Sequence, residues 1–540
     1  MKCENALDKS APKQISTSSV VATSVFALTF ILIGVPVWWK TTEVYRYPVP
    51  HEECHHLLSE TITHAVPIKI VLADQHVQQG VFWEELLLLS NNIEEVSQPF
   101  VNFHWTMSTA NDEEEAIIKQ HNNVSDLDAA FALSQQVLKA DVHQKSYGKL
   151  QIIVLPKDYA KGLKFTIGRN RQAYILNDAD SKHLAQDVFA LARKIAQVER
   201  LKKLYTPISS YTGGKIPDKD RMRYLRSSSR FDVTFSLIVP EPHIVNINWD
   251  IDKAINAYMK LFLEELDLVS SVTIKSQILY MTSLPIPTQM SRDERGEFVL
   301  NLEHLPSLIN PIEARLGSDT SVDSNLNFVV YIPTKEQTPL QIYDSKGQPI
   351  SSYAFLLPQW GGFLMYNCPV PENSSLPHSV NLDVHAMMEV FLSQLRLLLG
   401  LPEMDSLSDE KCQVLPSSNI RKWEVDFLLR KNSQEYLSSA ISSLSSLSQL
   451  LKTIGNIVIR DDVGQKIYFS LSSTKKSLML LREGYLEEGY TKAQAAFLAS
   501  DEVFFDPSLL ALLYFPEDQK YAIYIPLFLP ISIPVITSMS

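Results

Sequence analysis

Glycine is scarce in this chain, with 17 glycines in 540 residues, well below the usual share of about 7%. Phosphate-cradling loops depend on glycine, and neither GxGxxG nor GxxxxGK[ST] occurs. The nucleophile elbow GxSxG of serine hydrolases is missing as well. No long basic stretch is present and the net charge is −12, which argues against nucleic acid as a partner.

Cysteine is also rare, with four residues: Cys3, Cys54, Cys368 and Cys412. Cys3 precedes the first apolar run, so three cysteines remain in the main body. They allow at most one internal disulfide with one thiol left over, and they leave an intermolecular bridge open. The chain is therefore not a disulfide scaffold.

Two charge-free runs stand near the ends of the chain, Val20–Trp39 and Tyr521–Ser540. A helix of about 20 apolar residues crosses a bilayer core of about 30 Å. Trp38, Trp39 and Lys40 suit the interface with the headgroups. The alternative is a cleaved signal peptide, but its apolar region is about 7–15 residues long and ends in small residues. We therefore expect two uncleaved transmembrane helices, the second kinked by Pro526, Pro530 and Pro534.

Basic residues near the first run predict the orientation. Three lysines precede it, and Lys40 and Arg46 follow it, which slightly favours a cytosolic N-terminus. Two Asn-x-Ser sequons, at Asn123 and Asn373, are candidate N-glycosylation sites. Glycosylation at either would place the main body in the secretory lumen.

Between the runs, the pattern alternates between helices and strands. Apolar residues recur at helical spacing over 181–204, 249–268 and 384–399, and Gly400 and Pro402 end the last helix. Strand patterns cover 151–155, 231–237, 272–281 and 328–332, and strict alternation over 231–237 predicts a half-buried strand. Residues 433–499 are predicted to be mostly helical.

The predicted fold class is α/β: a large mixed α/β lumenal domain with a helical C-terminal region, flanked by N- and C-terminal transmembrane helices. The expected organisation is a cytosolic tail (1–19), a transmembrane helix (20–39), a stalk (40–66), a mixed α/β lumenal body (67–402), a helical lumenal region (403–503), a membrane-proximal collar (504–520) and a short or truncated transmembrane segment (521–540).

One motif matches a zinc site. His51-Glu-Glu-Cys-His55 fits HExxH, in which two imidazoles hold zinc and the glutamate is the base. Prolines flank it, no long helix precedes it, and no third ligand follows at a recognised spacing. A solvated loop or a short stalk helix is favoured, and no metal site is predicted.

Other catalytic constellations have little local support. Cys368 or Cys412 could act as a nucleophile with His378 or His385 as base, but neither thiol lies in a protease-like signature. The acidic pairs Asp250/Asp252, Glu264/Glu265 and Asp461/Asp462 cannot be aligned for acid–base chemistry from sequence. Asp250 suits the beginning of a helix. We predict no catalytic residue and no cofactor.

Blocks spread over the chain resemble the PIG-S family, a subunit of the glycosylphosphatidylinositol (GPI) transamidase. They are Gly34–Tyr45 (GVPVWWKTTEVY), Trp249–Asp252 (WDID), Ser276–Tyr280 (SQILY), Ile309–Ser318 (INPIEARLGS), Trp360–Gly362 (WGG), Met388–Gly400 (MEVFLSQLRLLLG), Asn456–Val463 (NIVIRDDV), Phe504–Leu510 (FFDPSLL) and Leu513–Pro530 (LYFPEDQKYAIYIPLFLP). Residues 80–230 resemble the family only loosely.

The resemblance implies an endoplasmic-reticulum membrane protein with two spans and a lumenal bulk. In that family the complex replaces a C-terminal signal peptide of a precursor with a GPI anchor. Its chemistry belongs to a cysteine-protease-like subunit, PIG-K, and the other partners are PIG-T, PIG-U and an aminopeptidase-like subunit. Asn373 falls at a matching family sequon. The family usually carries a full second span and a basic tail, whereas this sequence stops at Ser540.

The sequence thus predicts a non-catalytic structural subunit of the GPI transamidase, in contact with membrane lipid. The alternatives are a membrane- or GPI-anchored lumenal hydrolase and an adhesion ectodomain. A terminal apolar run without a basic tail suits a GPI signal, but the small-residue triplet and polar spacer of such a signal are not clean here.

Overall fold

The computed structural model describes most of the chain. The described residues are 17–42, 45–94, 100–139, 147–159, 164–178, 181–204, 224–284, 298–301, 305–316, 324–344, 346–371, 375–403, 407–408, 411–417, 419–454, 457–510, 522, 524–526, 528–530, 532–533 and 536–537.

The first sheet has six strands in the order β15-β4-β5-β3-β1-β2. Its strands are β1 (His64–Leu72), β2 (Val101–Thr109), β3 (Leu150–Pro156), β4 (Phe165–Ile167), β5 (Gln172–Asn177) and β15 (Cys412–Val414). All neighbouring pairs are parallel except β4 and β5. The predicted strand 151–155 is confirmed, since β3 is buried on both faces as an apolar run of this kind requires.

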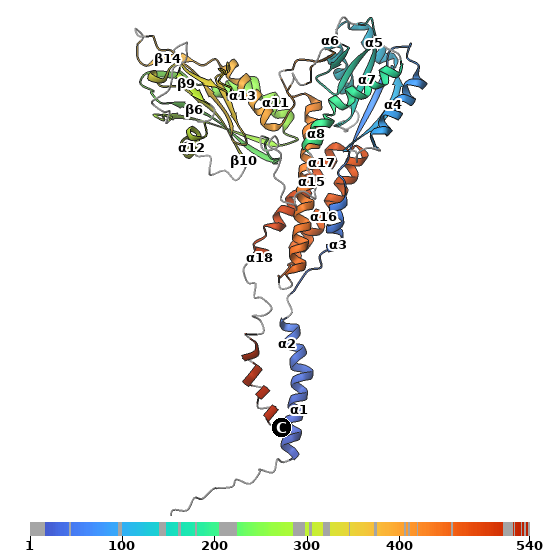
Figure 1. Cartoon of the computed structure of the whole chain (residues 1–540), viewed down its shortest axis with the longest axis vertical. Coiled ribbons are helices and arrows are strands. Elements are labelled where there is room, and N and C mark those ends of the chain that lie inside the picture. Colours follow the sequence, from blue (N-terminus) through green and yellow to red (C-terminus); the bar gives the residue numbers. More distant parts are fainter. Residues whose placement is uncertain are drawn as a thin grey trace, which may run out of the picture. The chain divides into compact units, whose positions relative to one another are not determined.

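Helices lie on both faces of this sheet (Figure 1). On one face, α5 (Asp112–Gln120) and α6 (Val124–Lys139) bring Ile118 and Phe131 against Val71 and Ile153. On the other, Phe189 of α7 (Ser181–Ile195) packs against the rings of β2, and α4 (Gln79–Glu94) lies beside α7. The helix predicted over 181–204 is present but divides into α7 and α8 (Val198–Leu204).

The second sheet has five strands in the order β12-β13-β10-β6-β8. They are β6 (Arg230–Val239), β8 (Ser271–Tyr280), β10 (Ser324–Tyr331), β12 (Ala354–Leu357) and β13 (Gly361–Met365). Only β12 and β13 pair antiparallel. Two small parallel sheets pair β9 (Phe298–Asn301) with β11 (Leu340–Tyr343), and β7 (Val245–Asn248) with β14 (His378–Asn381).

The prediction of a half-buried strand over 231–237 is wrong. Nine of the ten residues of β6 are buried, because β6 lies between β10 and β8 and both of its faces are covered. The polar side chains at alternate positions are satisfied within the sheet: Asp232 pairs with Lys275, and Ser236 accepts a hydrogen bond from Gln277. Paired polar groups can be buried at modest cost, so alternation alone did not mark a solvent face.

The helices of the second sheet follow the predicted stripes. The stretch 249–268 forms α10 (Ile251–Ala254), the π-helical turn η4 (Ile255–Met259) and α11 (Lys260–Leu266). The segment 384–399 is α13 (Val384–Leu399), ended by Gly400 in the left-handed conformation that glycine favours. On the other face, α12 (Leu305–Leu316) contributes Ile309 and Ile312 to a second core cluster. The 3-10 turn η7 (Lys335–Gln337) completes this part.

The C-terminal region is helical as predicted, with α15 (Lys422–Thr453), α16 (Asp461–Glu483), α17 (Leu486–Phe504) and the short α18 (Pro507–Leu510). The first of these helices begins at Lys422, well before the predicted Ser433. Residues 511–521 of the predicted collar lie outside the described residues.

The first apolar run is helical in three consecutive pieces: α1 (Thr17–Thr29), the π-helical turn η1 (Phe30–Gly34) and α2 (Val35–Thr42). Pro36 has no N–H to donate and its ring collides with the carbonyl of residue 32, which accounts for a wide turn at this place. No helix in the described part of the chain is both long and apolar enough to cross a membrane.

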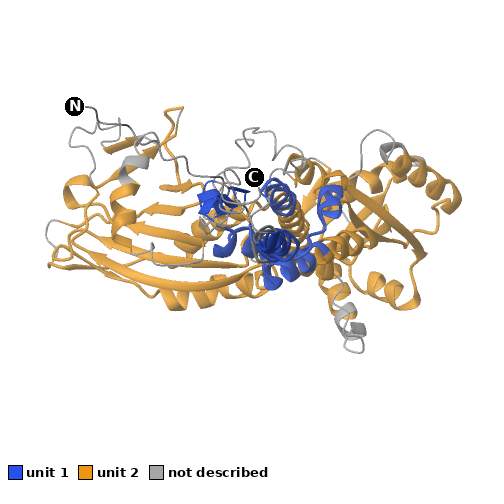
Figure 2. Ribbon diagram, turned by 90° about the horizontal axis from the view of Figure 1, so that it is seen from below, with its two compact units in different colours: residues 1–57, 443–471, 498–540 blue, residues 58–442, 472–497 orange. Residues whose placement is uncertain are grey.

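The predicted stalk contains regular structure: α3 (His51–His56), the 3-10 turn η2 (Leu57–Ser59) and the beginning of β1 at His64. By their internal contacts, the residues fall into two compact units (Figure 2). Unit 1 comprises residues 1–57, 443–471 and 498–540, and unit 2 comprises residues 58–442 and 472–497.

Candidate functional site

The HExxH motif forms a short helix, as the sequence favoured. His51 begins α3, and its Nδ1 lies 2.8 Å from Ser448 Oγ, so the ring is held by a hydroxyl. Glu52 and His55 are exposed, whereas Cys54 between them is buried. Among the described residues, no three His, Cys, Asp or Glu side chains come together as metal ligands would.

Cys412 and the candidate base His378 lie on different sheets. Cys412 is buried in β15 of the six-stranded sheet, whereas His378 belongs to the β7–β14 pair. His385 is exposed on α13, 3.6 Å from Glu389. Cys54, Cys368 and Cys412 are all buried, and none of these three described cysteines forms a disulfide. Burial raises the pKa of Cys368 to about 11, so its thiol stays protonated near neutral pH and is a poor nucleophile.

Two of the three acidic pairs lie at the beginnings of helices. Asp250 precedes α10 as predicted, where it pairs with Lys253 at 2.5 Å and makes no side-chain cap hydrogen bond. Asp461 and Asp462 begin α16, and the hydroxyl of Tyr45 donates to Asp461. Carboxylates in the first turn of a helix favour its dipole.

Of the two predicted N-glycosylation sites, the structure describes only Asn123. Asn373 lies outside the described residues. Asn123 is exposed immediately before α6, and its Oδ1 accepts a hydrogen bond from the Ser125 N–H at 3.1 Å. Its amide nitrogen, the atom that a glycan would modify, takes no part in that bond.

A polar cluster surrounds the first turns of α15, and no local sequence pattern predicts it. Seven side chains, here called the α15 cluster, are charged and almost fully buried or paired with a buried partner: Arg171, Arg396, Arg421, Glu424, Asp426, Arg430 and Lys431. Each makes a hydrogen bond or ion pair that joins α15 to another segment or closes its first turn. Buried charges of this kind are tolerated only when they are paired and hydrogen-bonded.

On one side, the α15 cluster binds the six-stranded sheet. Asp426 accepts two hydrogen bonds from Arg171, beside the first residue of β5, at 2.7 and 2.8 Å. Arg430 donates to the carbonyl of Gly148 at 3.1 Å. Trp423 of the same helix donates from Nε1 to the carbonyl of Gly168 at 3.0 Å.

Gly168 is required by close packing in this turn. A Cβ atom there would lie 2.1 Å from the Oδ1 of Asp128 and 2.8 Å from the Gln172 carbonyl. Asp128 is fully buried, and it accepts from the Arg169 N–H and the Tyr174 hydroxyl. Burial raises the pKa of Asp128, and these hydrogen bonds counteract the shift.

On its other side, α15 binds α13 and the segment before β6, which flank the five-stranded sheet. Glu424 accepts from Arg396 near the end of α13 at 2.5 Å, and Lys431 donates to the carbonyl of Leu399 at 3.0 Å. Glu435 accepts from both the N–H and the hydroxyl of Ser227, just before β6. Directional polar contacts therefore hold α15 to both sheets of unit 2.

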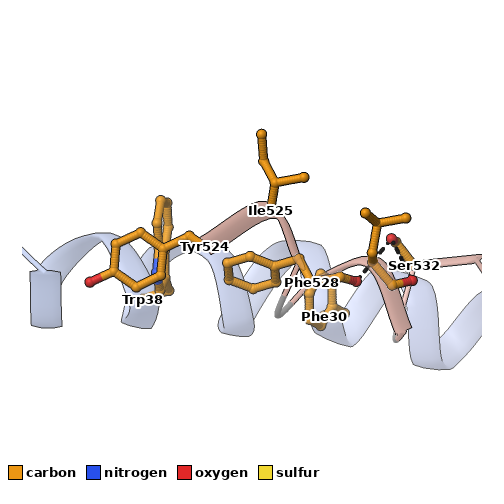
Figure 3. Close-up of a pocket in the computed structure, with 7 residues that line it drawn as sticks. Phe30, Trp38, Tyr524, Ile525, Phe528 and Ser532 are labelled. Atoms are coloured by element: carbon orange, nitrogen blue, oxygen red, sulfur yellow. Dashed lines mark hydrogen bonds between the residues drawn. The ribbon is translucent and has the colours of Figure 1, made fainter. Parts of the chain in front are cut away.

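A second feature is an aromatic pocket of about 350 Å³ between the two terminal segments in unit 1 (Figure 3). Trp38 meets the rings of Tyr524 and Phe528 edge to face, with centroids 5.6 and 5.4 Å apart, and Phe30 meets Phe528 at 6.1 Å. Ser532 Oγ lies 2.9 Å from the Phe528 carbonyl, so this hydroxyl is bound within its own turn. Apart from Ser532, the described residues that line the pocket are aromatic or aliphatic, and none of them is charged.

The order of the ring contacts gives the direction of the two segments. Going from Trp38 back to Phe30, the partners advance from Tyr524 to Phe528. The two apolar segments therefore run antiparallel where they meet. No signal in the sequence specified this pairing, since both runs are apolar around their whole circumference.

These features define the class of the protein: a mixed α/β body with a polar, helical C-terminal region and apolar segments near both ends that contact each other. The family comparison is more specific. Residues 25–540 match the family model described as phosphatidylinositol-glycan biosynthesis class S protein, and the chain belongs to this PIG-S family.

Named relatives align with nearly the whole chain. A Bos taurus protein named GPI-anchor transamidase component PIGS is 34% identical over 536 residues, covering 95% of this chain and 93% of its own length. The Homo sapiens protein of the same name is 33% identical with the same coverage. The GPI transamidase component PIG-S homolog of Schizosaccharomyces pombe is 24% identical over 92% of this chain and 79% of its own length.

Proposed function

We propose that this chain is a non-catalytic structural subunit of the endoplasmic-reticulum GPI transamidase, supporting the transfer of GPI anchors to the C-termini of precursor proteins. One observation carries the proposal. Proteins named GPI-anchor transamidase component PIGS align with 95% of the chain at 33–34% identity, so the shared part is the whole architecture rather than one module.

Catalysis resides in another subunit, the cysteine-protease-like PIG-K, and PIG-T, PIG-U and the aminopeptidase-like subunit are the other partners. Two observations support the assignment of a structural role. The three described cysteines are buried thiols, and burial raises the pKa of Cys368 to about 11. The α15 cluster places its charges in ion pairs and main-chain hydrogen bonds, not around a cavity.

Two membrane spans, near residues 20–39 and 521–540, hold the chain with its bulk in the lumen. The ring contacts of Trp38 and Phe30 show that the C-terminal segment runs antiparallel to the first apolar run. This supports the topology, because a first span that enters the lumen and a second span that leaves it must run in opposite directions. Aromatic side chains near one end of the pair suit the membrane interface. The charge-free pocket beside them suits contact with lipid chains.

The remaining organisation follows the order of the chain: a cytosolic tail (1–19), a segment to 66 that leads into the lumenal body (67–402), a helical lumenal region (403–503) and a collar (504–520). Lumenal exposure makes Asn123 and Asn373 acceptors for N-glycans. The exposed position of Asn123 supports its use.

Affinity purification of the tagged full-length chain in mild detergent tests the assignment. We expect the other four subunits to co-purify, and cells without this chain to lose GPI attachment until it is restored. Recovery of the chain alone, with normal GPI attachment in its absence, would contradict the proposal. Release by a GPI-specific phospholipase would indicate a GPI-anchored ectodomain, and maturation to the cell surface an adhesion module.

A further inference from the structure

β8 ends the five-stranded sheet and leaves one of its long sides open. It pairs with β6 over ten residues, Ser271 to Tyr280, and no described residue pairs with its outer side. Six of its ten residues are exposed. An unpaired edge of this length is a template for another strand, and many proteins protect such edges with lysine, proline or a bulge.

The ladder with β6 identifies which main-chain groups are open. Ser271 donates its N–H to Ser229, and Met281 donates to Val239. In a parallel pair, these bonds recur at every second residue, so the odd-numbered residues of β8 face β6. The N–H and C=O groups at the even positions therefore point away from the sheet, namely those of Val272, Ile274, Ser276, Ile278 and Tyr280. One of them, the Tyr280 carbonyl, accepts a hydrogen bond from the Thr282 hydroxyl at 3.3 Å.

The one lysine of this strand does not guard the edge. Lys275 Nζ lies 2.6 Å from Asp232 on β6, whose side chain is 8% exposed. The ammonium group is thus drawn back over its own sheet. On the opposite face, the second half of β8 exposes Ile278 and Tyr280, the latter to 57%, and Met281 follows at 78%. Open main-chain groups and exposed apolar side chains coincide there.

We propose that β8 accepts an extended segment of another polypeptide of the assembly, which adds a sixth strand to this sheet. The main-chain groups of the five even-numbered residues would bind it, and its alternate apolar side chains would lie beside Ile278 and Tyr280. A second copy of the chain is the alternative occupant, and the test below distinguishes it. The inference rests on the proposed subunit role.

Hydrogen exchange of the 271–281 segment tests this directly, with the full-length chain measured alone and in the purified transamidase. In the assembled state, we expect exchange of the even-numbered amides to be at least about tenfold slower, as for other hydrogen-bonded strands. The amides of β6 are the internal reference, because they are already bonded in both states. Equal exchange of β8 in both states would overturn the inference.

A proline substitution distinguishes loss of strand addition at the open edge from loss of folding. Ser276→Pro removes an outward N–H and leaves the ladder with β6 intact, which an edge strand tolerates. Ser276→Ala is the matched control, since it keeps the N–H. We expect S276P to keep the wild-type melting temperature and to lose the protection of β8 in the complex, with S276A behaving as wild type. Full protection in S276P would contradict strand addition.

The outcomes also separate this inference from the subunit role. If the wild-type chain co-purifies with the transamidase while β8 stays unprotected, only strand addition fails. If the wild-type chain does not co-purify at all, the subunit role fails first. Concentration-dependent protection in the isolated chain would identify a second copy as the partner and overturn the choice made here.

Discussion

The ion pair between Asp426 and Arg171 provides the sharpest test of the α15 cluster. The Asp426 side chain is fully buried, and that of Arg171 is 16% exposed. Two hydrogen bonds of 2.7 and 2.8 Å join them in the bidentate geometry of a strong pair. Asp426 also attracts Arg430 one turn further along α15, so a single carboxylate balances two buried guanidinium groups.

Asp426→Asn removes this charge while keeping the size of the side chain. One carboxylate oxygen becomes an amide donor that faces a guanidinium donor, and two cations lose their counter-charge. Breaking a buried pair from one side costs about 3–5 kcal/mol. At roughly 2 °C per kcal/mol for a body of this size, the melting temperature should fall by about 6–10 °C.

Thermal unfolding followed by tryptophan fluorescence measures this loss, because the buried Trp423 lies one turn from Asp426. Glu115→Gln is the matched control: its pair with Lys119 is on the surface of α5, where an ion pair contributes about 0–1 kcal/mol. The loss of unfolding free energy in the double variant D426N/R171M should be smaller, by at least about 1.5 kcal/mol, than the sum of the losses in the two single variants. Additive losses, or a D426N effect as small as that of E115Q, would refute the reasoning.

Three further predictions concern single side chains. His64 is buried with no hydrogen bond to either ring nitrogen, and burial, together with the charge of Arg430, lowers its pKa from 6.5 to about 3. At pH 5 the His64 imidazole is therefore protonated in the unfolded chain and neutral in the folded chain, which lowers the free energy of unfolding by about 2 kcal/mol. The melting temperature of His64→Phe should therefore fall less than that of the wild type between pH 6.5 and pH 4. The same pH dependence in both proteins would contradict this. Cys368 should react with a maleimide only after denaturation, and rapid labelling of the native protein would disprove its burial. Asn123→Gln and Ser125→Ala should each remove one endoglycosidase-sensitive glycan. Only Asn123→Gln also removes the side-chain cap of α6, which should cost about 1 kcal/mol of stability. A wild-type glycan pattern in both variants would show that Asn123 is not modified.

Local patterns predicted those elements whose signals lie within one segment. The helix 384–399 carries its apolar stripe and its terminating Gly400 in one continuous segment, and α13 has these bounds. The strand 151–155 is apolar from Ile152 to Leu155, as burial on both faces demands. In such cases neighbouring residues contain the information that the fold uses.

The missed features depend on distant partners. Asp426 and Arg171 are 255 positions apart, so the first turns of α15 resemble a solvated polar stretch. The same holds for Asp232 in β6, whose partner Lys275 makes its burial tolerable. The pairing of the two terminal apolar runs was equally hidden, because apolar residues carry no marker of register.

The polar contacts of α15 suit a subunit that works by holding parts in place. Apolar burial is non-directional and scales with area, so it would tolerate sliding of a helix along a sheet. Ion pairs and hydrogen bonds to single carbonyls do not tolerate such sliding, because they weaken steeply as the donor–acceptor distance and angle change. Asp426 and Arg430 fix α15 to the six-stranded sheet, and Glu424 and Lys431 fix it to the end of α13. A displacement of one sheet must therefore break charged contacts to the other, and this couples the position of the β8 edge to the rest of unit 2.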